Sequence, residues 1–244
     1  MDSIGIEIAI IVLSDRLMAL KSIYSRIVPF YESANRSFTL GLDNVWRKIA
    51  ARSTSGFPIT CMLDICCGTG DMTIEIIQVH QGKIVGVDFS KPMIDKAKRR
   101  IPTANATFIL SDAEKLPFED NTFDLVVISF ATRNLYNSVD GLKYYLKEFK
   151  RVLRRGGLFL NLETTIPQRK IFELLMIVYV KIIVKFLGRL LTGRMRHYGF
   201  LSDSMIEFFT APVLSKILCD IGFKQVQWML LPPGVSAVHW AWKK

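Results

Sequence analysis

The stretch that decides the fold is Met62-Leu63-Asp64-Ile65-Cys66-Cys67-Gly68-Thr69-Gly70-Asp71. An apolar run ends in a carboxylate, passes through a turn of small residues and opens into a segment with helical character. Asp88 ends a second apolar run 18 residues past Gly70. A strand, a glycine turn, a helix and a strand that ends in an acid form the nucleotide-binding half of a doubly wound fold. The sequence therefore predicts a nucleoside-containing ligand here, with Asp88 accepting hydrogen bonds from the ribose; the alternative is a tight glycine turn without a ligand.

The residues around the turn separate the classes of nucleotide ligand. A dinucleotide site uses Gly-x-Gly-x-x-Gly against a pyrophosphate, whereas Asp64 and Asp71 flank this turn. Two carboxylates attract a cation and repel a pyrophosphate. No Lys follows the glycines, which excludes a phosphate-binding P-loop. The Asp-x-x-x-Gly-x-Gly arrangement resembles motif I of the S-adenosylmethionine-dependent methyltransferases, with Cys66 where glycine is usual.

That resemblance implies S-adenosylmethionine as the cofactor. Asp64 would face its methionine end through a hydrogen-bond network, and Asp88 would hold its ribose. Asp112 follows the third predicted strand and can accept from the adenine amino group; the alternative is a capped loop with a solvated charge. The expected cofactor-binding residues are Asp64, Cys66, Gly68, Thr69, Gly70, Asp88, Phe89, Asp112, Ala113 and Ser129. No metal site is expected, because His80, His197 and His239 lack metal-ligand spacing.

Predicted strands and helices alternate along the chain. Strands are expected over 60–65, 83–87, 106–110, 123–129 and 157–163, helices over 71–79, 91–100 and 139–153, and a closing antiparallel pair over 226–231 and 236–242. This order predicts an α/β, doubly wound, Rossmann-like sheet of seven mostly parallel strands, as in class I methyltransferases, with N-terminal helices and a helical insertion. The predicted domains are 1–56, an N-terminal helical lid and acceptor-binding region; 57–168, the cofactor-binding core; 169–210, an amphipathic insertion facing membrane or acceptor; and 211–244, a C-terminal helix and strands completing the sheet.

Further segments resemble the ubiquinone/menaquinone biosynthesis C-methyltransferases. They are Tyr31-Glu32-Ser33-Ala34-Asn35-Arg36-Ser37-Phe38-Thr39-Leu40-Gly41 followed by Trp46, Ser129-Phe130-Ala131-Thr132-Arg133-Asn134, and Arg151-Val152-Leu153-Arg154-Arg155-Gly156-Gly157. The resemblance implies methyl transfer to a ring carbon of a polyprenylated quinol. Glu32, Thr39, Ala131 and Arg155 depart from the family pattern, which points to a distant member and leaves the acceptor open.

The same resemblance implies Arg133, Asn134 and Tyr31 as catalytic residues. Arg133 is a poor base because its pKa is very high, so it is expected to stabilise the phenolate or to orient a proton-accepting water. Asn134 and Tyr31 would hydrogen-bond the ring oxygens. The alternative for Arg133 is a salt bridge to Asp124 or Glu163, and the alternative for Tyr31 is an ordinary aromatic of the lid.

Composition indicates where the protein works. The 244 residues carry a net charge of +10, half are hydrophobic, and the mean hydropathy is +0.27. A basic, apolar chain suggests an anionic membrane surface or nucleic acid. Four cysteines without metal spacing fit a reduced, intracellular protein. The expected location is cytoplasmic, with peripheral membrane association.

One segment concentrates the charge. Residues 169–196 hold seven Lys or Arg and one acid, and Lys181, Lys185 and Arg189 recur every four residues on one face of an apolar helix. Such charges argue against a spanning helix and favour a helix lying at an anionic membrane surface. A core helix or a dimer face are the alternatives.

Other functions remain open. A phospholipid N-methyltransferase would use the same cofactor site and the same basic helix. An RNA methyltransferase would explain the charge, but the charge is not interleaved with exposed aromatics, so no nucleic-acid partner is expected. A non-catalytic, methyltransferase-like membrane scaffold is opposed by the intact motif residues. The expected partners are a prenylated quinone or another lipid-like acceptor and an anionic membrane surface, and the sequence also allows a homodimer.

Overall fold

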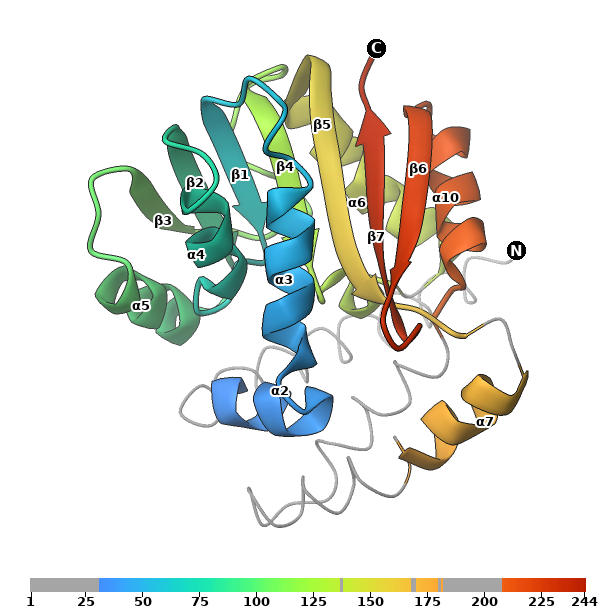
Figure 1. The fold of residues 1–244 in the computed structure, drawn as a ribbon. Helices are drawn as coiled ribbons and strands as arrows, with labels where there is room; N and C mark the ends of the chain where they lie inside the picture. Colours follow the sequence, from blue (N-terminus) through green and yellow to red (C-terminus); the bar gives the residue numbers. More distant parts are fainter. Residues whose placement is uncertain (1–30, 137, 168–169, 180, 182–207) are drawn as a thin grey trace, which may run out of the picture.

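The protein is built around one seven-stranded sheet with helices on both faces (Figure 1). The computed structural model describes residues 31–136, 138–167, 170–179, 181 and 208–244. The strands are β1 (Cys61–Ile65), β2 (Lys83–Asp88), β3 (Ala106–Leu110), β4 (Phe123–Ser129), β5 (Leu153–Thr164), β6 (Lys224–Leu231) and β7 (Ser236–Trp242). The described helices are α2 (Tyr31–Thr39), α3 (Leu42–Arg52), α4 (Asp71–Ile77), α5 (Lys91–Arg100), η1 (Thr132–Asn134), α6 (Val139–Val152), α7 (Lys170–Tyr179) and α10 (Ala211–Asp220).

The strand order is β3-β2-β1-β4-β5-β7-β6, and only β7 runs antiparallel to its neighbours. β1 therefore pairs with β2 on one side and with β4 on the other, both in parallel. The strand order reverses between β1 and β4, and a doubly wound sheet binds its ligand in the crevice at this reversal. The predicted mostly parallel, Rossmann-like sheet is confirmed.

Local details differ from the sequence-based expectation. The helix predicted over 139–153 ends at Val152, and the chain enters β5 directly at Leu153. Ser90 occupies the N-cap position of α5, but its hydroxyl makes no capping hydrogen bond. The Ser90 backbone N–H instead donates to Asp88 Oδ1 at 2.8 Å, so the loop before α5 is tied to the end of β2.

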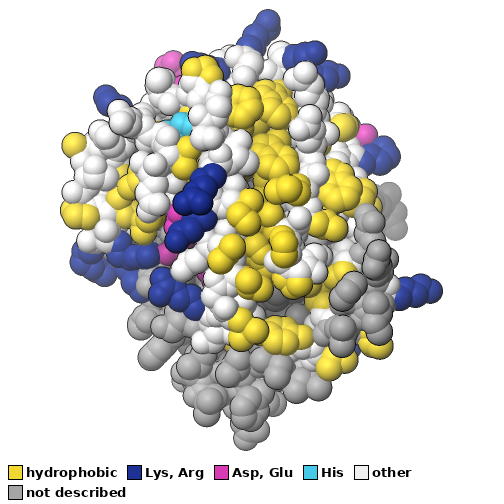
Figure 2. Space-filling model, in the orientation of Figure 1, with side chains coloured by type: hydrophobic (Ala, Val, Ile, Leu, Met, Phe, Trp, Pro, Cys, Tyr) yellow, Lys and Arg dark blue, Asp and Glu magenta, His cyan; other side chains and the backbone are white. Residues whose placement is uncertain are grey.

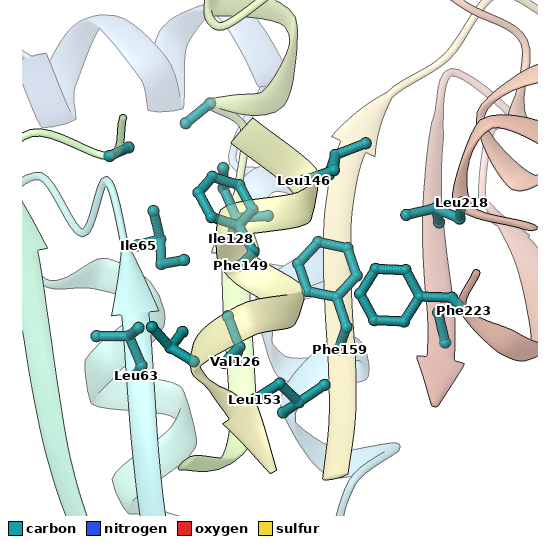
Figure 3. Close-up of a cluster of buried hydrophobic side chains, with 14 of the residues drawn as sticks. Leu63, Ile65, Val126, Ile128, Leu146, Phe149, Leu153, Phe159, Leu218 and Phe223 are labelled. Carbon is teal, nitrogen blue, oxygen red and sulfur yellow. The ribbon is translucent and has the colours of Figure 1, made fainter. Parts of the chain in front are cut away.

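The hydrophobic core fills both faces of the sheet. On one face, side chains of β1, β4 and β5 pack against α6 and α10 (Figure 3). The rings of Phe159 and Phe223 stack there with centroids 5.3 Å apart, and Phe149 lies beside them. Truncating a buried Phe to Ala costs about 3–5 kcal/mol. These aromatics therefore anchor the C-terminal part of the chain to the parallel strands that hold the ligand crevice.

Helix α3 forms part of the layer on the opposite face. Trp46 is buried there, and its indole N–H donates to the Pro232 carbonyl at 2.7 Å. Trp240 on β7 donates to Ser53 Oγ at 2.9 Å. Residues 42–52, which the sequence assigned to a lid over 1–56, are thus packed on the sheet. The division into four domains otherwise stays a prediction.

The same face of the molecule carries an apolar patch. In Figure 1 no described helix lies in front of β7 and β6, and Figure 2 shows hydrophobic side chains gathered over this region beside a group of Lys and Arg side chains. Phe57 packs against Trp242 with ring centroids 6.0 Å apart, and both Phe57 and Met229 are exposed. This patch is available to a partner surface.

Much of the predicted 169–210 insertion lies outside the described residues, including Lys185 and Arg189 of its basic face. Its first helix, α7, is described: Met176 is buried, Leu174 and Val178 are exposed, and the Tyr179 hydroxyl donates to the Phe38 carbonyl at 3.0 Å. Among the described residues, no helix is both long and apolar enough to span a bilayer.

Candidate active site

The turn after β1 brings the backbone close to the crevice. Cys66 has φ +54° and Gly70 has φ +86°, both in the left-handed region. The Cys67 N–H donates to the Val87 carbonyl at 2.9 Å, which joins the turn to the end of β2. The left-handed backbone at Gly70 favours glycine, and a Cβ there would also lie 2.6 Å from the terminal methyl of Ile101, which would have to move. Cys66 adopts a conformation that favours glycine, which explains why glycine is the usual residue at this position.

Asp64 is a buried carboxyl with an unused acceptor. Its Oδ2 accepts from the Thr73 hydroxyl at 2.6 Å, and its Oδ1 has no hydrogen-bond partner among the described residues. Burial raises its pKa to about 7, against the lowering effects of the Thr73 hydrogen bond and the Arg47 charge. An unsatisfied buried oxygen is costly, and a cationic hydrogen-bond donor would satisfy it.

Asp88 holds the ends of two loops together. Its Oδ2 accepts from the Gly68 N–H at 3.0 Å and its Oδ1 from the Ser90 N–H. Burial raises its pKa to about 6, while these two hydrogen bonds lower it. Each carboxylate oxygen keeps further acceptor capacity. Asp88 can therefore accept from a pair of ligand hydroxyls while it keeps the loops in place.

A pocket of about 800 Å³, partly open to solvent, lies at the carboxyl ends of the parallel strands. The pocket is lined by Cys66, Gly68, Val87, Asp88, Phe89, Met93, Ser111, Asp112, Ala113, Ser129, Phe130, Ala131, Asn134, Leu135 and Tyr145. These lining residues include two carboxylates and no Lys or Arg, and the rest are mostly apolar or small. The pocket therefore suits a ligand with an apolar body and a positive charge.

S-adenosylmethionine fits this set of residues. Its sulfonium and ammonium are cations, and its ribose offers two hydroxyls. Asp88 supplies acceptors for the hydroxyls, Asp112 supplies a second carboxylate in the wall, and Asp64 supplies the unsatisfied buried oxygen behind the turn. The close backbone at Gly68, whose amide already contacts Asp88, leaves room that a side chain would fill.

The structure brings together most of the residues that the sequence singled out. Lining the pocket are Cys66, Gly68, Asp88, Phe89, Asp112, Ala113, Ser129 and Asn134, whereas Asp64, Thr69, Gly70 and Arg133 do not line it. The carbonyl and hydroxyl of Thr69 both accept from Arg100, at 2.8 and 2.9 Å. Arg100 also pairs with Asp71 at 2.8 Å, so the charge of Asp71 is compensated there. Tyr31 begins α2, but its side chain lies outside the described part.

Arg133 forms a buried ion pair. Its guanidinium lies 2.5 Å from Glu163 Oε1, and its backbone N–H donates to Glu163 Oε2 at 3.2 Å. Asn161 lies two residues earlier on β5 and accepts from the Thr132 hydroxyl. Of the two salt-bridge partners that the sequence allowed, Glu163 is the one found, and Asp124 pairs with Arg154 instead. Polar side chains of β5 thereby fasten η1, and Asn134 at its end lines the pocket.

Sequence reasoning did not single out Tyr145 and Met93, which also line the pocket. Burial and the nearby charges of Asp112 and Glu114 raise the pKa of Tyr145 to about 12, so the phenol stays protonated and can donate. Tyr145 lies three residues after the buried Leu142 on α6. This helical spacing places both residues on the face of α6 that packs on the sheet, and it was the sequence signal that could have identified Tyr145. Met93 reads as an ordinary core residue of α5, and nothing in the sequence distinguishes it.

The comparisons with known proteins agree with this site. The model of the ubiE/COQ5 methyltransferase family matches residues 12–243. Demethylmenaquinone methyltransferase of Staphylococcus aureus is 32% identical over 225 residues, which cover 91% of this chain and 92% of that protein.

Solved structures share the fold. An S-adenosylmethionine-dependent methyltransferase of Thermotoga maritima aligns with a TM-score of 0.59 at 20% identity, covering 92% of this chain and 99% of that one. Phosphoethanolamine N-methyltransferase 2 of Haemonchus contortus, in complex with S-adenosylhomocysteine, aligns with a TM-score of 0.59 at 16% identity, covering 80% of this chain and 52% of that one. With a family model matched over nearly its whole length, a class I fold and a pocket suited to its cofactor, the chain belongs to the ubiE/COQ5 methyltransferase family and is an S-adenosylmethionine-dependent methyltransferase.

Proposed function

We propose that the protein methylates a ring carbon of a polyprenylated quinone precursor, as a step of quinone biosynthesis. The observation that carries this proposal is the pocket wall formed by the end of β4 and η1. Phe130, Ala131 and Leu135 make this wall apolar, and Asn134 adds one amide to it. Such a wall fits a flat ring that carries one or two oxygens. The name of the Staphylococcus aureus relative gives the same class of acceptor.

The cofactor side of the pocket binds S-adenosylmethionine and orients its methyl group. We propose that Asp88 holds the ribose hydroxyls, Asp112 the adenine amino group and Asp64 the methionine end. Bound in this way, S-adenosylmethionine supplies an electrophilic methyl group on a sulfonium. Holding two reactants in line is a large part of catalysis by such a site, and the two hydrogen bonds of Asp88 to the loop backbone hold its carboxylate in place.

The acceptor side has to favour an ionised ring hydroxyl. We propose that Asn134 hydrogen-bonds a ring oxygen and that Arg133 acts through its positive charge, either on the phenolate itself or on a water that takes the proton. The ion pair with Glu163 fixes the position of the guanidinium, which keeps its positive charge. Tyr31, on α2, is proposed as a second donor to the ring oxygens.

The direct test uses purified protein, methyl-labelled S-adenosylmethionine and a total lipid extract from the host, followed by mass spectrometry of labelled lipids. Label on a quinone ring would support the proposal and identify the acceptor. Label on a phospholipid head group would replace it by phospholipid N-methylation. Binding of S-adenosylmethionine without any labelled lipid would refute a lipid acceptor, and failure to bind it would favour a non-catalytic scaffold.

We further propose that the protein works in the cytoplasm, at an anionic membrane surface, because its acceptor carries a membrane-embedded tail. The basic positions Lys181, Lys185 and Arg189 and the exposed apolar Leu174 and Val178 of α7 support this.

Vesicle sedimentation would test the membrane proposal with phosphatidylglycerol and phosphatidylcholine vesicles. Changing Lys181, Lys185 and Arg189 to Gln should reduce binding to the anionic vesicles only. A matched control removes the same charge from α5 (Lys91, Lys96 and Lys98 to Gln) and should keep binding. Equal loss in both triple variants would contradict a specific role for this face. Homodimerisation stays a prediction, and analytical ultracentrifugation would measure it.

A further inference from the structure

A buried arginine behind the cofactor turn has donors to spare. Arg47 lies on α3, and its side chain is 5% exposed. It pairs with Asp43 at 2.6 Å, and the Thr39 hydroxyl donates to the other oxygen of Asp43 at 2.8 Å. The Nε of Arg47 is buried and has no hydrogen-bond partner among the described residues. A guanidinium carries five N–H donors, so one carboxylate leaves most of its capacity unused.

Arg47 lies beside the pocket. Its guanidinium carbon is 4.9 Å from the centroid of the Phe130 ring, and Phe130 is a wall residue of the pocket. It is also close enough to Asp64 for its charge to oppose the burial-induced rise in the pKa of that carboxyl. No direct ion pair joins Arg47 and Asp64 among the described interactions. Two buried groups of opposite charge, each with an unsatisfied polar atom, thus stand near each other without touching.

A zwitterionic amino acid matches this pair. The methionine end of S-adenosylmethionine carries an ammonium and a carboxylate on one carbon, whereas the pocket wall offers carboxylates and no Lys or Arg. The other buried arginine near the crevice, Arg133, is paired with Glu163. We propose that Arg47 binds the α-carboxylate of S-adenosylmethionine while Asp64 takes its ammonium, so that α3 contributes a cofactor-binding residue.

The assignment explains why Asp43 is present. A lone buried guanidinium is strongly unfavourable, and Asp43 compensates it while the amino-acid end is absent. Because Arg47 can serve two carboxylates at once, Asp43 need not move when the cofactor binds. The inference rests on the S-adenosylmethionine-dependent activity and is independent of the proposed quinone acceptor.

Calorimetry with two ligands tests it without any acceptor. S-adenosylmethionine and its decarboxylated analogue differ only in the α-carboxylate. A charge-assisted contact corresponds to roughly a 10- to 100-fold difference in affinity, and the wild-type protein should prefer S-adenosylmethionine by about this factor. Arg47→Gln should lose this preference by weakening S-adenosylmethionine alone, with the analogue's affinity kept within about twofold.

Two further variants separate contact from packing. Asp43→Asn keeps Arg47 and its packing on Phe130 but removes the ion pair, so the preference should persist. Arg47→Lys keeps a positive charge and should retain part of the preference for S-adenosylmethionine over its decarboxylated analogue. A wild-type protein that binds both ligands equally would overturn the proposal, whatever the variants do. So would an Arg47→Gln protein that loses both ligands by the same factor, or an Asp43→Asn protein that loses the preference. Failure of the quinone proposal would leave all these binding results unchanged.

Discussion

The two sides of the ligand crevice handle charge in opposite ways. On the β1–β2–β3 side, Asp88 lines a pocket whose wall holds no Lys or Arg, and Asp64 keeps a buried oxygen without a hydrogen-bond partner among the described residues. On the β4–β5 side, the charged groups pair with each other, as Arg133 does with Glu163. The first side therefore holds charge for a ligand to compensate, whereas the second uses charge to fasten η1 below an apolar wall.

This difference separates two roles, ligand binding and support of the fold, which a sequence motif alone does not distinguish. A residue whose partner is missing in the free protein is available to a ligand, and its substitution should affect binding. A residue whose partner is present holds the fold, and its substitution should affect stability first. Variants on the two sides should therefore separate in unfolding and binding measurements.

The largest expected effect is a loss in the free energy of unfolding, caused by breaking an ion pair on the β4–β5 side of the crevice. Glu163→Ala leaves the guanidinium of Arg133 buried without its carboxylate, and breaking such a pair costs about 3–5 kcal/mol. Urea unfolding would measure this loss. Lys216→Gln, which breaks the solvent-exposed pair with Asp220 on α10, serves as control and should cost below about 1 kcal/mol. Equal losses would mean that the buried pair is not special.

Asp64 should make stability depend on pH. The unfolded carboxyl ionises near pH 4 and the folded one near its raised pKa of about 7. Below both values the group is protonated in either state, so the free energy of unfolding should fall as pH rises through this window, by as much as roughly 4 kcal/mol. Asp64→Asn should remove the Asp64 share of this slope and leave the smaller share of Asp88, whose pKa is raised to about 6. An unchanged slope would assign all of it to other groups.

Asp88 should affect ligand binding. Asp88→Asn removes the charge that strengthens hydrogen bonds to the ribose hydroxyls, which should weaken S-adenosylmethionine by about 10- to 100-fold. Calorimetry would measure the affinity. Asp95→Asn, an exposed carboxylate paired with Lys91 on the same segment, should bind normally. Normal binding by Asp88→Asn as well would remove Asp88 from the site.

The smallest expected effect concerns the turn itself. Cys66 has φ +54°, a conformation that costs an L-residue about 1 kcal/mol. Cys66→Gly should raise the free energy of unfolding by up to about 1 kcal/mol and leave S-adenosylmethionine affinity within about twofold. A clear loss of stability would show instead that the packing of the thiol outweighs the backbone strain.

The sequence predicted the sheet, and it singled out residues that meet at one side of the crevice, because both depend on local pattern. The roles of these residues toward the cofactor stay predictions. Apolar runs marked the strands, and Gly68 and Asp88 sit at fixed distances along the chain within one strand-turn-helix-strand unit. The acceptor side depends on contacts between segments far apart. The sequence offered Asp124 and Glu163 equally as partners of Arg133, and only the register of β5 beside β4 brings Glu163 next to it.

Arg47 illustrates most clearly what a local sequence pattern fails to predict. It follows Trp46 on a short amphipathic helix, where an arginine reads as a solvated residue. It is buried on α3, a helix that Trp46 fastens to the Pro232 carbonyl, 186 residues further along the chain. No local pattern contains that information.

The contact between Trp46 and Pro232 also bears on the order in which the protein can be assembled on the ribosome. Helix α3 is synthesised before the sheet, whereas its carbonyl partner Pro232 and the strand β7, which lies between β5 and β6, are synthesised after β5. A nascent chain that has completed β1 to β5 has to wait with β5 as an open sheet edge. The complete sheet can therefore form only once the hairpin of β6 and β7 has emerged from the exit tunnel, and until then the edge of β5 is open to pairing with other strands.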